Sequence, residues 1–305
     1  MPQSERHIPT RDEIQKLLWG AAPEIRLSGF RVTGTGRAGA TEFQNVTVSD
    51  GHEEINGCFI PPQSANAPAI LYCHAHGHAY DIGQAEVMAG RPALARPYGP
   101  DLAALGFAVL CLDMPAFGAR QNPGEDARAK AHAWHGRTLF GQMIGELQAA
   151  IGILAAHPQI DPARIGTLGI SMGGTHAWWL AALDPRVAFS VDLCATADLG
   201  CLIDHGGHDL HGHYMTVPGL VSHCRTGVLA GLAAPKPKFV GVGLQDRLSP
   251  PPCFEAARKD LEAAYDGHAD ALTFHIAPDT GHQETPAMRR AVLDFLQDRG
   301  KALRA

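Results

Sequence analysis

From about residue 69 onward, the chain alternates short apolar runs with longer stretches in which apolar residues recur at helical spacing. The helical stretches lie at 101–105, 129–157, 172–183, 253–265 and 286–299, and the apolar runs between and beside them at 69–74, 107–113, 165–170, 187–193, 239–244 and 272–277. Continuously apolar strands belong to a sheet that is covered on both faces, which is the usual situation of parallel strands. We therefore predict an α/β fold whose mostly parallel sheet carries helices on both faces.

The preceding residues have a pattern typical of an antiparallel sheet edge. Two stretches rich in β-branched and aromatic residues lie at 41–48 and 54–60, and a turn signal at 49–51 joins them. We expect an antiparallel hairpin at the N-terminal edge of the sheet.

The remaining segments suggest how the chain is divided. Residues 1–40 hold one helical pattern at 11–19 and then a glycine-rich run, and we expect them to form a helical appendage. Residues 41–305 are expected to form the main domain, since no linker or repeat interrupts them. The long segment at about 198–232 has no strand pattern, and we expect it to form a lid or a pocket wall.

Composition narrows the class of partner. The formal charge is −6 when the 17 histidines are counted as neutral. Nucleic-acid binding surfaces are usually basic, so we expect a small-molecule substrate and no nucleic acid. The sequence leaves open whether the chain forms a homo-oligomer.

Cysteine usage and the leading residues bear on the compartment. The seven cysteines lie mostly in apolar runs, which indicates free buried thiols in a reducing compartment. The polar opening at 1–7 lacks the apolar core of a secretory signal, and we see no later stretch that is long and apolar enough to cross a bilayer. We therefore expect a cytoplasmic protein with no membrane partner.

The strongest chemical signal is Gly-x-Ser-x-Gly at 169–173, directly between the apolar run at 165–170 and the helical stretch at 172–183. A strand, a sharp turn and a helix form the setting of a nucleophile elbow, where glycines permit the tight turn and the serine hydroxyl projects above the sheet. A glycine-rich helix start with an N-capping serine is the alternative. The placement favours Ser171 as a nucleophile.

A serine hydroxyl needs a general base, and the base needs an orienting acid. Behind an elbow of this kind the chain order is serine, acid, histidine. Asp246 follows the apolar run at 239–244, at the strand end where open α/β sheets place their sites. Asp192, Asp198 and Asp279 are rival acids, and Asp279 is expected to shape its own turn.

Among the 17 histidines, His282 lies in the loop between the last predicted strand and the last predicted helix. That loop is where the base belongs in the expected order. His275 falls inside the strand and is expected to be structural. We predict Ser171, Asp246 and His282 as the catalytic residues.

The apolar run at 69–74 leads into a polar loop, and such a loop supplies one backbone N–H of an oxyanion hole. The donor is the backbone of His76 or of His78, and strand length favours His76. The second donor is the backbone N–H of Met172, at the start of the helix after the serine.

Two histidine clusters also suggest metal chemistry. His74, His76 and His78 alternate along an extended segment and share one face. His205, His208, His211 and His213 form a second cluster, and the sequence leaves open whether these line the pocket. A serine mechanism needs no metal, so we expect no metal and no cofactor, with a metal-dependent hydrolase as the alternative.

Taken together, these motifs resemble the dienelactone-hydrolase and acetyl-xylan-esterase branch of the α/β-hydrolases. The resemblance is carried by residues 72–77, 112–118, 169–173, 214–219, 234–237 and 279–282. It implies the α/β-hydrolase fold with an eight-stranded sheet, a Ser-Asp-His triad and esterase-like chemistry. Dienelactone hydrolases carry cysteine at the elbow, so Ser171 moves the expectation towards ordinary esters.

The resulting expectation is a serine hydrolase that cleaves a small carboxylic ester through an acyl-enzyme. Hydrolysis of lactones, dienelactones or sugar acetates is the alternative, and the sequence does not choose the acyl group or the alcohol. Topology suggests Phe117, Trp134, His135 and His213 as pocket walls beside Met172.

Overall fold

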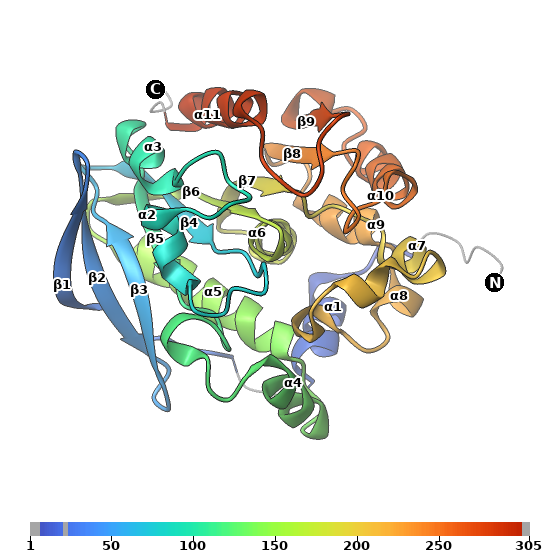
Figure 1. Cartoon of the computed structure of the whole chain (residues 1–305), viewed down its shortest axis with the longest axis horizontal. Coiled ribbons are helices and arrows are strands. Elements are labelled where there is room, and N and C mark those ends of the chain that lie inside the picture. The colour runs from blue at the N-terminus through green and yellow to red at the C-terminus, as the bar shows by residue number, and fades with distance from the viewer. Residues whose placement is uncertain (1–6, 21–23, 301–305) are drawn as a thin grey trace.

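A nine-stranded sheet forms the centre of the protein (Figure 1). The computed structural model describes residues 7–20 and 24–300, so most of the polar opening segment lies outside the described residues. The strands are β1 (Arg31–Ala38), β2 (Thr41–Ser49), β3 (Glu54–Ile60), β4 (Ala67–Cys73), β5 (Ala108–Leu112), β6 (Ile160–Ile170), β7 (Val187–Leu193), β8 (Lys238–Gly243) and β9 (Leu272–Ala277). The helices are α1 (Arg11–Trp19), α2 (Glu86–Ala89), α3 (Tyr98–Ala104), α4 (Glu125–Trp134), α5 (Leu139–Ala156), α6 (Met172–Leu183), α7 (Leu199–Asp204), α8 (Leu220–His223), α9 (Thr226–Ala230), α10 (Pro251–Ala264) and α11 (Pro286–Gly300).

The strand order is β1-β2-β3-β5-β4-β6-β7-β8-β9. The pairs from β1 to β5 are antiparallel, and the pairs from β5 through β4 to β9 are parallel. The predicted α/β fold with an antiparallel N-terminal edge is therefore confirmed.

β1 corrects the expected strand number and the expected helical appendage. Eight strands were expected, but residues 31–38 pair with β2 and add a ninth. Most side chains of β1 are exposed, and two of its eight residues are glycines, so it has no apolar pattern. Gly36 lies directly under the ring of Phe43, where a Cβ atom would collide with it.

A second correction concerns the helix expected at 129–157. Two helices are found there, α4 and α5, and they are separated by a turn at 135–138. Gly136 has φ +66°, a conformation that ends a right-handed helix and that glycine adopts readily. Thr138 then caps α5 by accepting a hydrogen bond from the Gly141 N–H at 2.8 Å.

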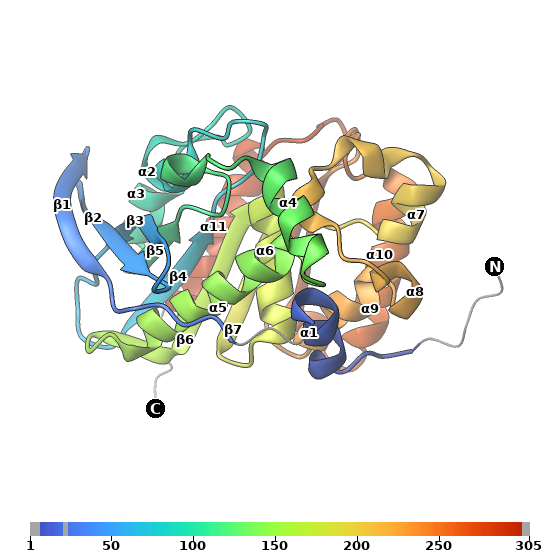
Figure 2. The ribbon, with the colours of Figure 1, turned by 90° about the horizontal axis from the view of Figure 1, so that it is seen from below.

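Helices cover both faces of the sheet, and successive side chains of each strand point alternately to the two faces. In β4, Leu71 packs in one core with α5 and α6, whereas Ile70 and Tyr72 pack in a second core with α3 and α11. Figure 2 shows α5 on the near side of the sheet and α11 behind it. This two-sided burial is the physical reason for the continuous apolar runs.

The expectation that no stretch is long and apolar enough to cross a membrane fails for one helix. By length and composition α5 passes that test, with 18 residues and a mean hydropathy of 1.4. However, 61% of this helix is buried inside the protein, where it packs between the sheet, α1 and α6. This burial is typical of a core helix in a globular protein.

Two histidines are buried completely, at the end of β4 and in α6. His74 Nδ1 lies 3.0 Å from the carbonyl oxygen of Ala75, and its Nε2 accepts the Met114 N–H at 3.1 Å. His176 stacks on Phe140 with ring centroids 5.4 Å apart, and neither of its nitrogens has a partner among the described residues. Burial lowers the pKa of His74 to about 4 and that of His176 to about 3.

The protein is expected to lose stability as the pH falls from about 6.5 towards 4. In that window the unfolded chain binds protons on these histidines and the folded chain does not, so each contributes a loss of about 1.4 kcal/mol per pH unit. Urea unfolding of the wild type and His176→Phe at about pH 7 and about pH 5 measures this difference. The variant keeps the aromatic stack and should show a smaller loss.

The matched control is His268→Phe, which changes an exposed histidine in the same way. It should retain the wild-type difference between the two pH values. An unchanged pH dependence in His176→Phe would contradict the assignment of this stability loss to His176.

Candidate active site

Ser171 sits at the sharp turn between β6 and α6. Its φ is +58°, a left-handed conformation that is strained for a residue with a side chain. The flanking glycines are required by space, because a Cβ atom at Gly169 or at Gly173 would collide with backbone atoms of Cys73. The elbow is thus pressed against the end of β4, and its backbone approach admits no side chain at these two positions.

A small cavity of about 30 Å³ lies beside Ser171. Ser171 and His282 both line this cavity, although they are more than one hundred residues apart in the sequence. Met172, at the first position of α6, lines it as well. The N–H groups in the first turn of α6 have no hydrogen-bond partner within the helix. They point out of its N-terminal end, where a negative charge is stabilised.

Asp246 and His282 form a hydrogen-bonded pair beside Ser171. His282 Nδ1 lies 2.7 Å from Asp246 Oδ2, and Asp246 Oδ1 accepts the Leu248 N–H at 2.8 Å. Asp246 is buried, and these two hydrogen bonds hold both of its carboxylate oxygens in place. His282 Nε2 is buried and has no partner among the described residues. One ring nitrogen is therefore fixed by the acid, and the other is free.

The rival acids are engaged elsewhere. Asp192 is buried in an ion pair with Lys238 and accepts a hydrogen bond from Thr196 Oγ1 at 2.5 Å. Asp198 caps α7 by accepting the Cys201 N–H at 3.0 Å. Asp279 lies in the turn after β9. None of these three is hydrogen-bonded to His282 in the described structure.

The loop after β4 is held by one buried carboxylate. Glu125 Oε2 lies 2.6 Å from His76 Nε2 and accepts a hydrogen bond from Tyr80 Oη at 3.0 Å, while Oε1 accepts the Tyr214 N–H at 2.8 Å. Burial alone would raise the pKa of Glu125, but the hydrogen bond and charge of His76 outweigh it and hold that pKa below its usual range. His76 Nδ1 in turn accepts the His78 N–H at 3.0 Å.

The four residues predicted as pocket walls do not line this cavity. Phe117 is buried in an aromatic cluster with His74, His76 and Tyr80. Trp134 is 91% exposed at the end of α4, and His135 is exposed beside it, because the helix ends there instead of continuing. His213 is exposed and bonds Asp126 at 2.8 Å.

Three of the wall residues that the sequence analysis missed lie on α6. Thr175, Trp178 and Trp179 all line the cavity. They follow Ser171 by four, seven and eight positions, which is the spacing of one helix face. That spacing could have identified them, whereas Phe140 and Tyr214 come from distant segments and gave no such signal.

The second histidine cluster is dispersed in the structure. His211 lines the cavity with Ser171, and its Nε2 lies 3.0 Å from the Leu248 carbonyl oxygen. Burial lowers the pKa of His211. His208 and His213 line a neighbouring cavity, and His205 lies against two cysteines. Within residues 7–20 and 24–300, neither histidine cluster gathers as a set of three ligands.

Comparisons with known proteins identify related hydrolases. Residues 95–193 match the model of the dienelactone hydrolase family. The chain is 36% identical over 252 residues to "Putative hydrolase YtaP" of Bacillus subtilis (strain 168), covering 81% of this chain and 84% of that protein.

Solved structures share the fold at lower identity. Acetyl xylan esterase 1 from Thermoanaerobacterium sp. JW/SL YS485 has a TM-score of 0.66 and 18% identity, with coverage of 97% of this chain and 96% of its own. A glucuronoyl esterase from Solibacter usitatus has a TM-score of 0.68 and 14% identity, with coverage of 95% and 92%. The family match, the 36% identical relative and the sheet order together show that the chain belongs to the dienelactone hydrolase family. It is an ester hydrolase with the α/β-hydrolase fold.

Proposed function

We propose that the protein hydrolyses small carboxylic esters with a short acyl group, using Ser171 as nucleophile, His282 as general base and Asp246 as its orienting acid. The observation that carries this proposal is the free Nε2 of His282 in the cavity of Ser171, while Nδ1 is held by Asp246 at 2.7 Å. A neutral imidazole with one nitrogen fixed by a carboxylate has its other nitrogen ready to accept a proton.

The reaction follows from these positions. Ser171 Oγ attacks the ester carbonyl carbon as His282 Nε2 takes the hydroxyl proton. The bond to the alcohol oxygen then breaks, and the proton passes from His282 to the leaving alcohol. Water attacks the acyl-enzyme with His282 again accepting a proton, and the carboxylic acid leaves as Ser171 regains its hydrogen. Asp246 stabilises the imidazolium that forms in both steps.

The backbone N–H groups of Met172 and His76 are the proposed oxyanion donors. Met172 opens α6, and His76 follows the end of β4 that packs against the elbow. The alternative donor, the His78 N–H, is already donated to His76 Nδ1 at 3.0 Å, which favours His76. The bond of His76 to Glu125 positions this loop.

The short acyl group is inferred from the cavity. Its volume is about 30 Å³, and it is walled by Phe140, Trp178, Trp179 and Tyr214. These walls are stiff and largely buried, so a long acyl chain has no room beside Ser171. We therefore infer an acetyl ester as the substrate, including an acetyl group carried by a sugar, because acetyl is among the smallest acyl groups. Acetyl xylan esterase 1 shares the fold.

Ser171→Ala is expected to lower kcat/KM for a short-chain ester by about 10⁴-fold or more, since the nucleophile is lost. A fluorophosphonate should label the wild type at Ser171, as mapped by peptide mass spectrometry, and should leave the variant unlabelled. Ser222→Ala, on the exposed surface of α8, is the matched control and should behave as wild type.

Retained activity in Ser171→Ala, or an adduct on another serine, would refute the nucleophile assignment. Activity that disappears with a chelator and is insensitive to the fluorophosphonate would instead support a metal-dependent hydrolase.

The acyl-length preference should change when Met215 is shortened. Met215 and Leu202 line both the Ser171 cavity and a neighbouring cavity of about 380 Å³. Met215→Ala should connect the two and raise kcat/KM for a hexanoate ester relative to the acetate of the same alcohol by roughly 10-fold or more, because one misfitting methylene is worth about 1–3 kcal/mol.

Val221→Ala is the control, because Val221 lines only the neighbouring cavity and should keep the wild-type preference. A wild type that cleaves hexanoate and acetate equally well would refute the short-acyl part of the proposal and leave the catalytic residues untouched.

A further inference from the structure

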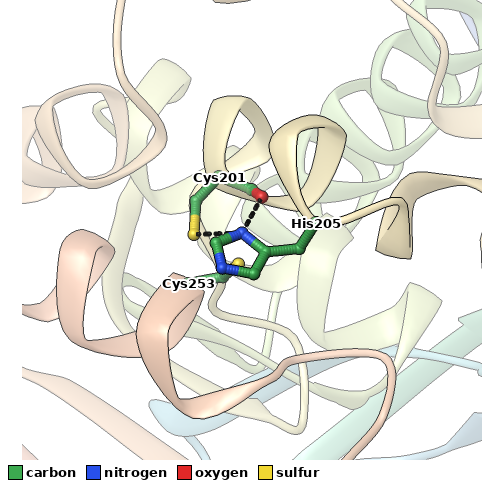
Figure 3. Close-up of side chains that lie close together, drawn as sticks. All are labelled: Cys201, His205 and Cys253. Atoms are coloured by element: carbon green, nitrogen blue, oxygen red, sulfur yellow. Dashed lines mark hydrogen bonds between the residues drawn. The ribbon is translucent and has the colours of Figure 1, made fainter.

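Three side chains suited to a soft metal ion meet where α7 packs against α10 (Figure 3). Cys201 and His205 come from α7 and its C-terminal cap, and Cys253 comes from the first turns of α10. One ligand atom from each of the three lies within 4.8 Å of the others. In Figure 3 the Cys201 sulfur lies beside the imidazole of His205, and the Cys253 sulfur overlaps that ring in this view.

The separation of the donors fits a tetrahedral ion. Cys201 Sγ and His205 Nδ1 are 3.5 Å apart. With Zn–S bonds of about 2.3 Å and Zn–N bonds of about 2.0–2.1 Å, two ligands at the corners of a tetrahedron lie about 3.5 Å apart. Cys201 and His205 are four residues apart, so a helical turn places both side chains on one face. Two thiolates and one imidazole are ligands that zinc accepts.

The surroundings favour a cation. The carboxylates of Asp198 and Asp204 act electrostatically on Cys253, and their negative charges attract a positive ion. Cys253 is buried, whereas Cys201 is partly exposed and His205 is exposed, so an ion can enter from solvent.

We propose that Cys201, His205 and Cys253 bind one zinc-like divalent ion, with water as the fourth ligand. Each thiol loses its proton on binding, so two protons are released per ion, and the neutral imidazole keeps its proton on the nitrogen that does not coordinate. In the described structure His205 Nδ1 lies 2.8 Å from the Cys201 carbonyl oxygen, and coordination through Nδ1 replaces that hydrogen bond.

The bound ion would fix α7 to α10. Leu199 and Leu202, on either side of Cys201 in α7, line the cavity of Ser171, and Leu202 packs against Cys253. The ion lies outside the proposed triad, and its role is to hold this wall of the cavity in place. The site therefore goes beyond the proposed hydrolysis, and its existence does not depend on it.

The test uses the full chain, reduced and freed of metal, with one equivalent of Co²⁺ and then Zn²⁺. The wild type should bind one ion per chain, develop the near-ultraviolet thiolate-to-cobalt band, and melt at a higher temperature with Zn²⁺. Cys201→Ser and His205→Gln should lose the band and the Zn²⁺-dependent rise in melting temperature. Because His205 is exposed, its variant is expected to fold normally.

His208→Gln and Cys224→Ser are the matched controls, an exposed histidine in the same segment and a buried cysteine outside the cluster. Both should bind the ion as the wild type does. A wild type that retains no ion, or variants at Cys201 and His205 that bind it unchanged, would overturn the proposal. A Cys201–Cys253 disulfide in air together with no metal uptake by the reduced protein would also overturn it.

Discussion

The close approach of the elbow to the end of β4 is the constraint on which the site depends. Backbone atoms of Cys73 occupy the space that a Cβ atom at Gly169 or Gly173 would need. This contact fixes the turn in which Ser171 keeps a left-handed φ of +58°, and the same contact brings the loop after β4 to the start of α6. The hydroxyl and the two proposed oxyanion donors therefore receive their positions from a single backbone contact, supported by the buried sheet on both sides.

The cavity has one wall made by the sheet and α6 and another made by short helices. Trp178 and Trp179 stand on α6, whose twelve residues are all buried. The opposite wall, with Leu202 and Met215, belongs to α7 and the short helical turns after it, which gather at the end of the molecule away from β1–β3 (Figure 1). Short helices have little stability of their own, so this wall depends on its packing against the body of the protein.

The sequence predicts the parallel sheet well, because two-sided burial leaves continuous apolar runs that no other arrangement explains as simply. It also predicts Ser171, Asp246 and His282 as neighbours, since each lies shortly after a strand in a fixed chain order. The structure places Asp246 and His282 within hydrogen-bonding distance, and Ser171 and His282 beside one cavity. β1 could not be predicted, because its exposed, glycine-containing strand is specified by pairing with β2 and not by burial. Trp134 was misplaced for a related reason, since the helix break at Gly136 depends on a backbone conformation that hydrophobic spacing does not record.

Glu125 links two parts of the site that are distant in sequence. One of its oxygens meets His76 and Tyr80, and the other accepts the backbone N–H of Tyr214, next to Met215 in the cavity wall. Removing that N–H would leave a buried carboxylate with an unpaired lone pair, which is costly in a medium of low polarity. A shift of the wall at Tyr214 and a shift of the histidine loop are therefore energetically coupled through one side chain. A displacement of that wall would therefore be transmitted to His76, whose backbone N–H is one of the two proposed oxyanion donors.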